Sequence, residues 1–166
     1  MRRTKFAREA GECNDEIDVI FRRMSEHFRR LERMYGSAPI NDFFAPRLQI
    51  VEAGHAELRL TVRPEFHHAA HAAHGAVYFK ALDDATFFAA NSLVEDVFVL
   101  TVSFNLYLTR PVCDGEIVAT GYVVSRSKRL YIAEGVLVDA RGREIARGSG
   151  SFMPSTTSLS ADIGYR

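Results

Sequence analysis

The chain has 166 residues, of which 47% are hydrophobic, a length and composition typical of one soluble domain with a sizeable core. Its 21 Lys and Arg residues balance its 21 Asp and Glu residues, so the overall charge indicates neither a nucleic-acid partner nor an anionic membrane surface. Two cysteines, Cys13 and Cys113, are too few for a disulfide framework, and the lack of a secretory signal or a membrane-length apolar run predicts a cytoplasmic protein.

Residues 15–35 are predicted to form an amphipathic helix. Its apolar side chains recur at spacings of three and four residues, at Ile17, Ile20, Phe21, Met24, Phe28, Leu31, Met34 and Tyr35. Asn14 suits the N-cap position, and Gly36 followed by Pro39 is typical of a helix end. We expect this helix to pack, as an extension, on the domain that follows it.

Residues 47–63 are predicted to form two paired strands. Apolar and polar positions alternate on both sides of a turn-prone segment at residues 52–55, and Pro64 ends the second strand. The alternation indicates a sheet with one buried face.

Residues 75–93 are predicted to form a helix buried on most sides, because the segment lacks proline and is apolar almost all round. Four alternating segments follow, and they are predicted as strands at residues 97–108, 116–125, 129–138 and 143–153. The links between them are short, so we expect these four strands to form an antiparallel meander.

These elements predict an α+β fold in which an antiparallel sheet curls around a central helix, with an extra N-terminal helix. The predicted organisation is an N-terminal extension at residues 1–36, a main domain at residues 37–155 and a flexible tail at residues 156–166, where the sequence lacks periodicity. A sheet of this size leaves edge strands, and pairing such edges between two copies is a common way to cover them.

Two adjacent carboxylates, Asp83 and Asp84, lie in the predicted central helix. Their side chains point about 100° apart, so they need separate explanations. Asp84 follows Lys80 by four residues, the spacing of a helical ion pair. Asp83 has mainly apolar neighbours, so its pKa should be raised, or the side chain should face a partner across an interface. The alternative is that both acids belong to a polar seam on the helix surface.

The start of this helix, at His74 and Gly75, could stabilise an anion. The N–H groups in the first turn of a helix have no partner within the helix, and a glycine lets a ligand approach the backbone closely. Such a helix end can bind the oxyanion that forms when a carbonyl group is attacked. The alternative is a glycine that only starts a tightly packed helix.

Four histidines, His67, His68, His71 and His74, lie just before or at the start of the helix. Their spacing would allow two of them to share a metal ion, but the nearby sequence offers only Glu65 as a supporting carboxylate. We therefore predict solvent-facing loop histidines, with no metal site and no bound cofactor. A nucleophile elbow, a P-loop and a dinucleotide-binding fingerprint are all absent from the sequence.

The segment HGAVYFKALDDATFFAANS, at residues 74–92, resembles the His-Gly-Gly motif and central helix of the PaaI-type hotdog thioesterases. Residues 101–152 resemble the four-strand run of the same family, through an F…Y…RPV…G entry and a D…G…IA.G.G.F ending. The resemblance covers about residues 40–153. It implies a hotdog fold, in which the sheet wraps the central helix, and hydrolysis of acyl-CoA or related acyl thioesters.

In that family the reacting acid lies nine residues after the motif histidine, so the resemblance assigns this role to Asp83, as a general base on water or as a nucleophile. Gly75 matches the glycine whose N–H polarises the thioester carbonyl, and Thr101 matches a hydroxyl that helps to place the water. His68 and His74 are assigned supporting contacts. The resemblance also implies active sites shared across a homodimer, which many relatives pair again into a tetramer.

The motif departs from the family pattern at two positions. His68 stands where the family commonly has Asn, and Ala76 stands where it has a second glycine. An imidazole can form hydrogen bonds as an amide does, but its charge changes near neutral pH.

Coenzyme A would be part of the substrate rather than a cofactor. The turn that contains Arg126, Lys128 and Arg129 suits its phosphates, because cations and turn amides bind them; the alternative is an ordinary solvated hairpin turn. The depth of an acyl tunnel should depend on large aromatic side chains, among them Tyr78, Phe79, Phe87 and Phe88.

Two other functions fit the same fold. A protein that binds acyl thioesters without turnover, as a sensor or carrier, would not need an acid at Asp83, and release of free thiol distinguishes it from a hydrolase. A hydratase would need a His a few residues downstream of an Asp in one loop, whereas here the candidate His74 precedes Asp83.

Overall fold

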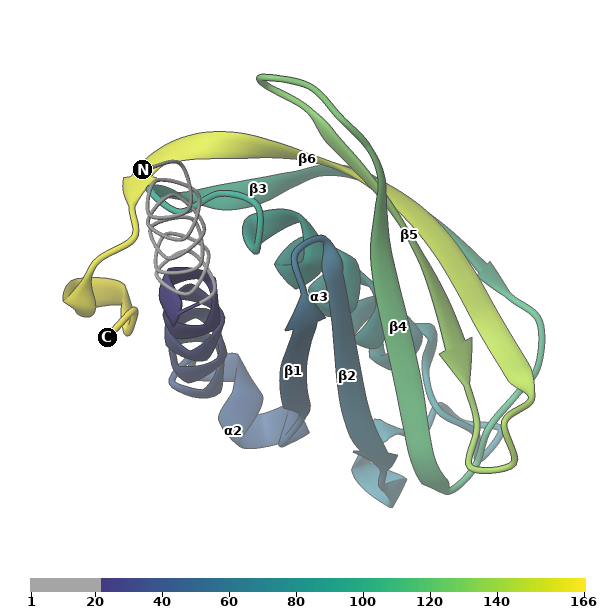
Figure 1. Ribbon diagram of the computed structural model, residues 1–166. Coiled ribbons are helices and arrows are strands. Elements are labelled where there is room, and N and C mark those ends of the chain that lie inside the picture. The colour runs from purple at the N-terminus through teal and green to yellow at the C-terminus, as the bar shows by residue number, and fades with distance from the viewer. Residues whose placement is uncertain (1–21) are drawn as a thin grey trace, which may run out of the picture.

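The computed structural model describes residues 22–166 and contains one antiparallel six-stranded sheet that curves around a central helix (Figure 1). An N-terminal helix covers residues 22–36, and its predicted beginning, like Cys13, lies outside the described residues. The other elements are α2 (Ile40–Phe44), β1 (Arg47–Glu52), β2 (His55–Val62), α3 (Gly75–Asn91), β3 (Val97–Leu108), β4 (Gly115–Arg126), β5 (Tyr131–Val138) and β6 (Glu144–Ser158), with 3-10 turns at Pro64–Phe66 and Ala161–Ile163. The predicted α+β fold is confirmed. Among residues 22–166, no helix is both long and apolar enough to cross a membrane.

The central helix α3 packs on the concave face of the sheet, as its apolar sequence predicts. Its fully buried residues include four alanines, Ala81, Ala85, Ala89 and Ala90. Gly121 on β4 lies so near that a Cβ there would be 2.6 Å from the carbonyl carbon of Ala85. Small side chains on both elements therefore set the close distance between helix and sheet.

The strand order β1-β2-β4-β5-β6-β3 corrects the predicted four-strand meander. Strands β4, β5 and β6 are consecutive neighbours, but β3 pairs with β6 at the sheet edge instead of with β4. The six-residue link 109–114 can make this crossing, because six residues reach about 20 Å and three strand spacings are only about 14 Å. The Tyr78 hydroxyl holds the link to α3 by donating to the Arg110 carbonyl at 3.1 Å and accepting from the Val112 N–H at 3.0 Å.

The residues after β6, which we call the C-terminal segment (159–166), fold back against the N-terminal helix. The predicted flexible tail at residues 156–166 is corrected, since β6 continues to Ser158 and the Tyr165 hydroxyl lies 2.7 Å from Nδ1 of the buried His27. The side chains of Leu159, Ile163 and Tyr165 pack against the core. Tertiary burial, which local periodicity cannot reveal, therefore orders this segment.

Candidate active site

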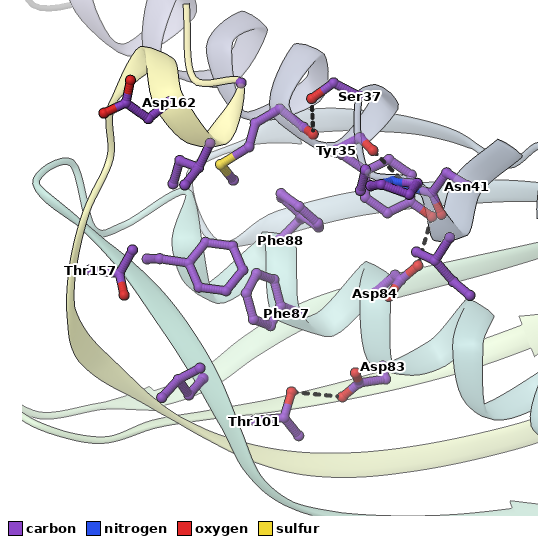
Figure 2. A pocket seen from close by; sticks show the side chains of 18 of the residues that line it. Tyr35, Ser37, Asn41, Asp83, Asp84, Phe87, Phe88, Thr101, Thr157 and Asp162 are labelled. Atoms are coloured by element: carbon purple, nitrogen blue, oxygen red, sulfur yellow. Dashed lines mark hydrogen bonds between the residues drawn. The ribbon is translucent and has the colours of Figure 1, made fainter.

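Asp83 lies midway along α3 and contacts β3. Its Oδ1 accepts a hydrogen bond from the Thr101 hydroxyl at 3.0 Å, although 18 residues separate the two in sequence. Figure 2 shows this pair below the rings of Phe87 and Phe88, which lie further along α3. The structure thus brings together the acid and the hydroxyl that the resemblance singles out.

Burial raises the pKa of Asp83 to about 6. The hydrogen bond from Thr101 acts in the opposite direction, because it stabilises the carboxylate form; the negative charge of Asp84 adds a smaller upward effect. A carboxyl group of this kind is largely ionised at neutral pH and yet poorly solvated. These properties suit a general base.

If Asp83 acts as a base, kcat/KM should rise with pH through a midpoint near 6 and level off above it, because only the ionised form can accept a proton. Thr101→Val should move this midpoint to higher pH, since it removes the hydrogen bond that lowers the pKa. The measurement is the pH profile of thioester hydrolysis for both proteins. A midpoint near the ordinary value of Asp, or identical midpoints in both, would contradict the assignment.

The neighbouring Asp84 has different partners. Its Oδ2 accepts a hydrogen bond from the Tyr35 hydroxyl at 2.6 Å and forms an ion pair with Lys80. The predicted pairing with Lys80 is confirmed, but the pair is mostly buried, with the side chains of Lys80 and Asp84 only 13% and 17% exposed. Burial raises the pKa of Asp84, whereas Lys80 and Tyr35 lower it. Asp84 therefore joins α3 to the N-terminal helix, a connection that α3's sequence alone does not indicate.

Asp84→Asn should lower the free energy of unfolding by roughly 1–3 kcal/mol, because it leaves the Lys80 ammonium poorly compensated in a mostly buried site. Glu95→Gln is a matched control, since it breaks the exposed Arg23–Glu95 ion pair and should cost at most about 0.5 kcal/mol. Urea denaturation compares the two variants. Equal losses would show that the Lys80–Asp84 pair contributes no more than a surface pair.

The predicted anion-binding site, at His74 and Gly75, lies at the start of α3, the opposite end from Phe87 and Phe88. His74 is the N-cap of α3, and its Nδ1 accepts a hydrogen bond from the Ala76 N–H at 3.0 Å. Among the described residues, none accepts a hydrogen bond from the Gly75 N–H. His68 and Gly75 both line a hollow of about 270 Å³ here. The Gly75 N–H is thus available to a ligand, whereas the Ala76 N–H is not.

Asp83 and Gly75 do not meet within one chain. They are eight residues apart on one straight helix, which corresponds to about 12 Å along its axis. They also line separate cavities, the hollow at the helix start and a larger groove near Asp83. One chain therefore keeps the two predicted groups in separate cavities.

The groove that contains Asp83 and Thr101 has a volume of about 910 Å³. Phe87 and Phe88 line this groove as expected. The other two aromatic side chains lie elsewhere: Tyr78 lines the hollow at Gly75, and Phe79 is 42% exposed and packs on Phe104. Sequence reasoning missed the part of the lining that comes from the two ends of the chain, namely Met34, Tyr35, Ile40, Thr157, Ile163 and Arg166. These residues are remote from the motif in sequence, so no local pattern could indicate them.

The basic residues Arg126, Lys128 and Arg129 lie at the tip of the β4–β5 hairpin, which projects beyond the sheet (Figure 1). Ser127 closes this turn, as its N–H donates to the Leu130 carbonyl at 2.8 Å. All three basic side chains are exposed, and within residues 22–166 none of them forms an ion pair.

The loop histidines have separate partners. Nε2 of His67 lies 2.7 Å from the carbonyl oxygen of Cys113, and Nδ1 of His68 accepts from the Ala70 N–H at 3.1 Å. His71 adopts a left-handed backbone conformation with φ of 60°. In the described part of the chain, no three His, Cys, Asp or Glu side chains are grouped so that they could hold a metal ion.

Comparison with known proteins identifies the architecture. Residues 70–146 match the sequence profile of the thioesterase superfamily, and no curated protein matches the chain. The fold is similar to that of the PaaI protein from the phenylacetic acid degradation operon of E. coli, with a TM-score of 0.75, 17% identity, and coverage of 82% of this chain and 98% of that one.

Two further structures are similar at a TM-score of 0.67. One is a thioesterase from Haemophilus influenzae, with 12% identity and coverage of 73% of this chain and 85% of that one. The other is AziG from S. sahachiroi, with 21% identity and coverage of 70% and 96%. The shared fold confirms the predicted hotdog architecture, and the profile match over residues 70–146 supports the predicted resemblance to the thioesterase superfamily.

Proposed function

We propose that the protein hydrolyses acyl-CoA or related acyl thioesters to a free acid and a thiol, with Asp83 as the reacting carboxylate. The observation that carries this proposal is the position of Asp83: a mostly buried carboxylate, held by Thr101, with a pKa raised to about 6, opens onto a large groove. A structural acid would be expected to have a cationic partner, as Asp84 has in Lys80.

The proposed reaction uses one water molecule. Asp83 takes a proton from the water while the water oxygen attacks the thioester carbonyl carbon, and the carbonyl electrons move onto the oxygen. The N–H of Gly75 stabilises this oxyanion, and collapse of the intermediate expels the thiolate. His74 holds the helix start in place through its hydrogen bond with Ala76, and His68 lies at the same hollow. A nucleophilic attack by Asp83 itself gives the same products through an anhydride.

If Asp83 and Gly75 act on the same carbonyl group, they must come from two copies of the chain, because they lie in separate cavities of one chain. β3 is an edge strand that carries exposed apolar residues, with Leu100 beside the Asp83 groove and Leu108 beside the Gly75 hollow. Antiparallel pairing of β3 with the β3 of a second copy, about a two-fold axis near Phe104, would set the Leu100 end of one strand against the Leu108 end of the other. We therefore propose a homodimer in which Asp83 of one subunit works with Gly75 of the other. A tetramer would require a second surface of this dimer to pair with another dimer.

The hairpin tip is the proposed site for the phosphates of coenzyme A. Arg126, Lys128 and Arg129 are exposed cations, and no residue of the described chain pairs with them. Coenzyme A then enters as part of the substrate and leaves as the product thiol.

Free-thiol release from a panel of acyl-CoA thioesters tests the proposal. The wild-type protein should turn over at least one member of the panel, and hydrolysis should release one thiol for each acid. The alternative is a binding protein without turnover, a sensor or carrier. Binding of acyl-CoA by calorimetry without thiol release would favour this alternative.

A further inference from the structure

The groove beside Asp83 is apolar along much of its length. Phe87 lies one helical turn beyond Asp83, and its ring centroid is 5.0 Å from that of Phe98 on β3. Phe88 packs on Phe87 with a centroid distance of 5.1 Å. Met34 adds an apolar wall from the N-terminal helix. Burial of an apolar group in such a lining is favourable.

Two charged side chains on the inner wall of the groove are paired with each other, whereas the buried Oδ1 of Asn41 has no hydrogen-bond partner among the described residues. Lys80 and Asp84 neutralise each other, and the Tyr35 hydroxyl donates to Asp84. The side chains of Asp162 (Figure 2) and Arg166 are exposed and belong to the C-terminal segment. An anionic ligand group placed beside Asp83 would therefore find no unpaired cation next to it, because Lys80 is paired with Asp84 and Arg166 lies on the exposed C-terminal segment.

The C-terminal segment forms one wall of this groove, through Ala161, Ile163 and Gly164. Gly164 has φ of 87°, and a Cβ at this position would overlap the Ser37 hydroxyl, so the backbone lies directly on the end of the N-terminal helix. His27 fixes the same segment, because one ring nitrogen lies 2.7 Å from the Tyr165 hydroxyl and the other lies 3.2 Å from the Asn91 carbonyl oxygen. The wall is thus held at a defined distance from α3.

We propose that this groove holds the acyl group of the substrate and that Ile163 in the C-terminal segment sets the largest acyl group that fits. The inference rests on the proposed function, because hydrolysis would place the acyl carbonyl carbon at Asp83. Asp83 lines the groove, so the rest of the acyl group would extend from there into it. The substrate class is an uncharged, apolar acyl chain longer than acetyl. A volume of about 910 Å³ lies in the range of pockets for ligands of this kind.

The first experiment measures kcat/KM for saturated acyl-CoA thioesters from acetyl to palmitoyl. For the wild-type protein, kcat/KM should rise about fourfold with each added methylene group until the groove is filled. Ile163→Ala should move the preferred length upward by about three carbon atoms, the number that the substitution removes. Ile163→Phe should move it downward. Val51→Ala, an exposed change on β1 away from the groove, should leave the profile unchanged.

The second experiment measures binding of the matching free fatty acids to Asp83→Asn protein by calorimetry, with and without Ile163→Ala. Affinity should show the same dependence on chain length, and Ile163→Ala should shift it in the same direction. Thermal unfolding of each variant verifies that it is folded.

The two experiments separate the two claims. If no thioester is hydrolysed but fatty acids bind with a length dependence that Ile163→Ala shifts, the proposed hydrolysis fails and the acyl groove stands. If thioesters are hydrolysed with a length profile that is identical in wild-type, Ile163→Ala and Ile163→Phe proteins, the hydrolysis stands and the role of the C-terminal segment is overturned.

Discussion

Asp83→Asn should lower kcat for thioester hydrolysis by about 10²–10⁴-fold, because Asn cannot accept a proton from water. The variant should still fold, since Asn has the same shape and can accept the Thr101 hydrogen bond. At about pH 8 the variant should also have a higher free energy of unfolding than the wild-type protein. Because the pKa of Asp83 rises from 3.8 to about 6 on folding, the native state binds this proton more tightly, and stability falls as pH rises through that interval. Thiol release and thermal unfolding measure the two effects.

Asp84→Asn is the matched control for activity. It removes a charge from the adjacent residue, but one that is paired with Lys80 and Tyr35. We expect kcat/KM to change little once the variant is verified to be folded at the assay temperature. Equal small losses in both variants would remove Asp83 from the mechanism and favour a binding protein. A large loss in Asp84→Asn alone would assign the chemistry to Asp84.

Gly75→Pro should lower kcat by about 10²–10³-fold, because proline lacks the N–H that is proposed to stabilise the oxyanion. The backbone can accept it. Proline is favoured at the first position of a helix, and His74 has φ of −65° and ψ of 146°, the extended conformation required of a residue before proline. Gly75→Ala is the control, since it keeps the N–H and adds a Cβ 3.3 Å from Cδ1 of Leu108. Similar losses in both variants would indicate a steric cause instead.

Mixing the two inactive variants tests whether the site is shared. A heterodimer of Asp83→Asn and Gly75→Pro subunits contains one site with both groups intact and one with neither. Random exchange of subunits makes half of the dimers mixed. Each mixed dimer has one intact site out of two, so the mixture should recover about a quarter of wild-type activity. Unmixed samples should stay inactive. No recovery, with subunit exchange verified by mass spectrometry, would contradict a site built from two subunits.

The sequence by itself determined most of the helices and strands. Hydrophobic periodicity indicated the central helix and the strands, because α3 is apolar almost all round and the strands alternate. The spacing between His74 and Asp83 distinguished Asp83 from Asp84, and Thr101 was assigned to the same site. The predicted elements depend on short-range patterns that one chain's sequence contains, whereas the assignments of Asp83 and Thr101 depend on the resemblance to a family motif.

Tertiary structure alone decided how distant segments meet. It placed β3 beside β6, since a six-residue link can reach either neighbour and its sequence does not choose between them. It buried the Lys80–Asp84 pair beneath Tyr35, which lies 49 residues from Asp84. It also packed the C-terminal segment on the N-terminal helix and so closed the groove beside Asp83. Each outcome depends on side-chain burial between segments far apart in the chain, and such burial leaves no periodic signal in either segment.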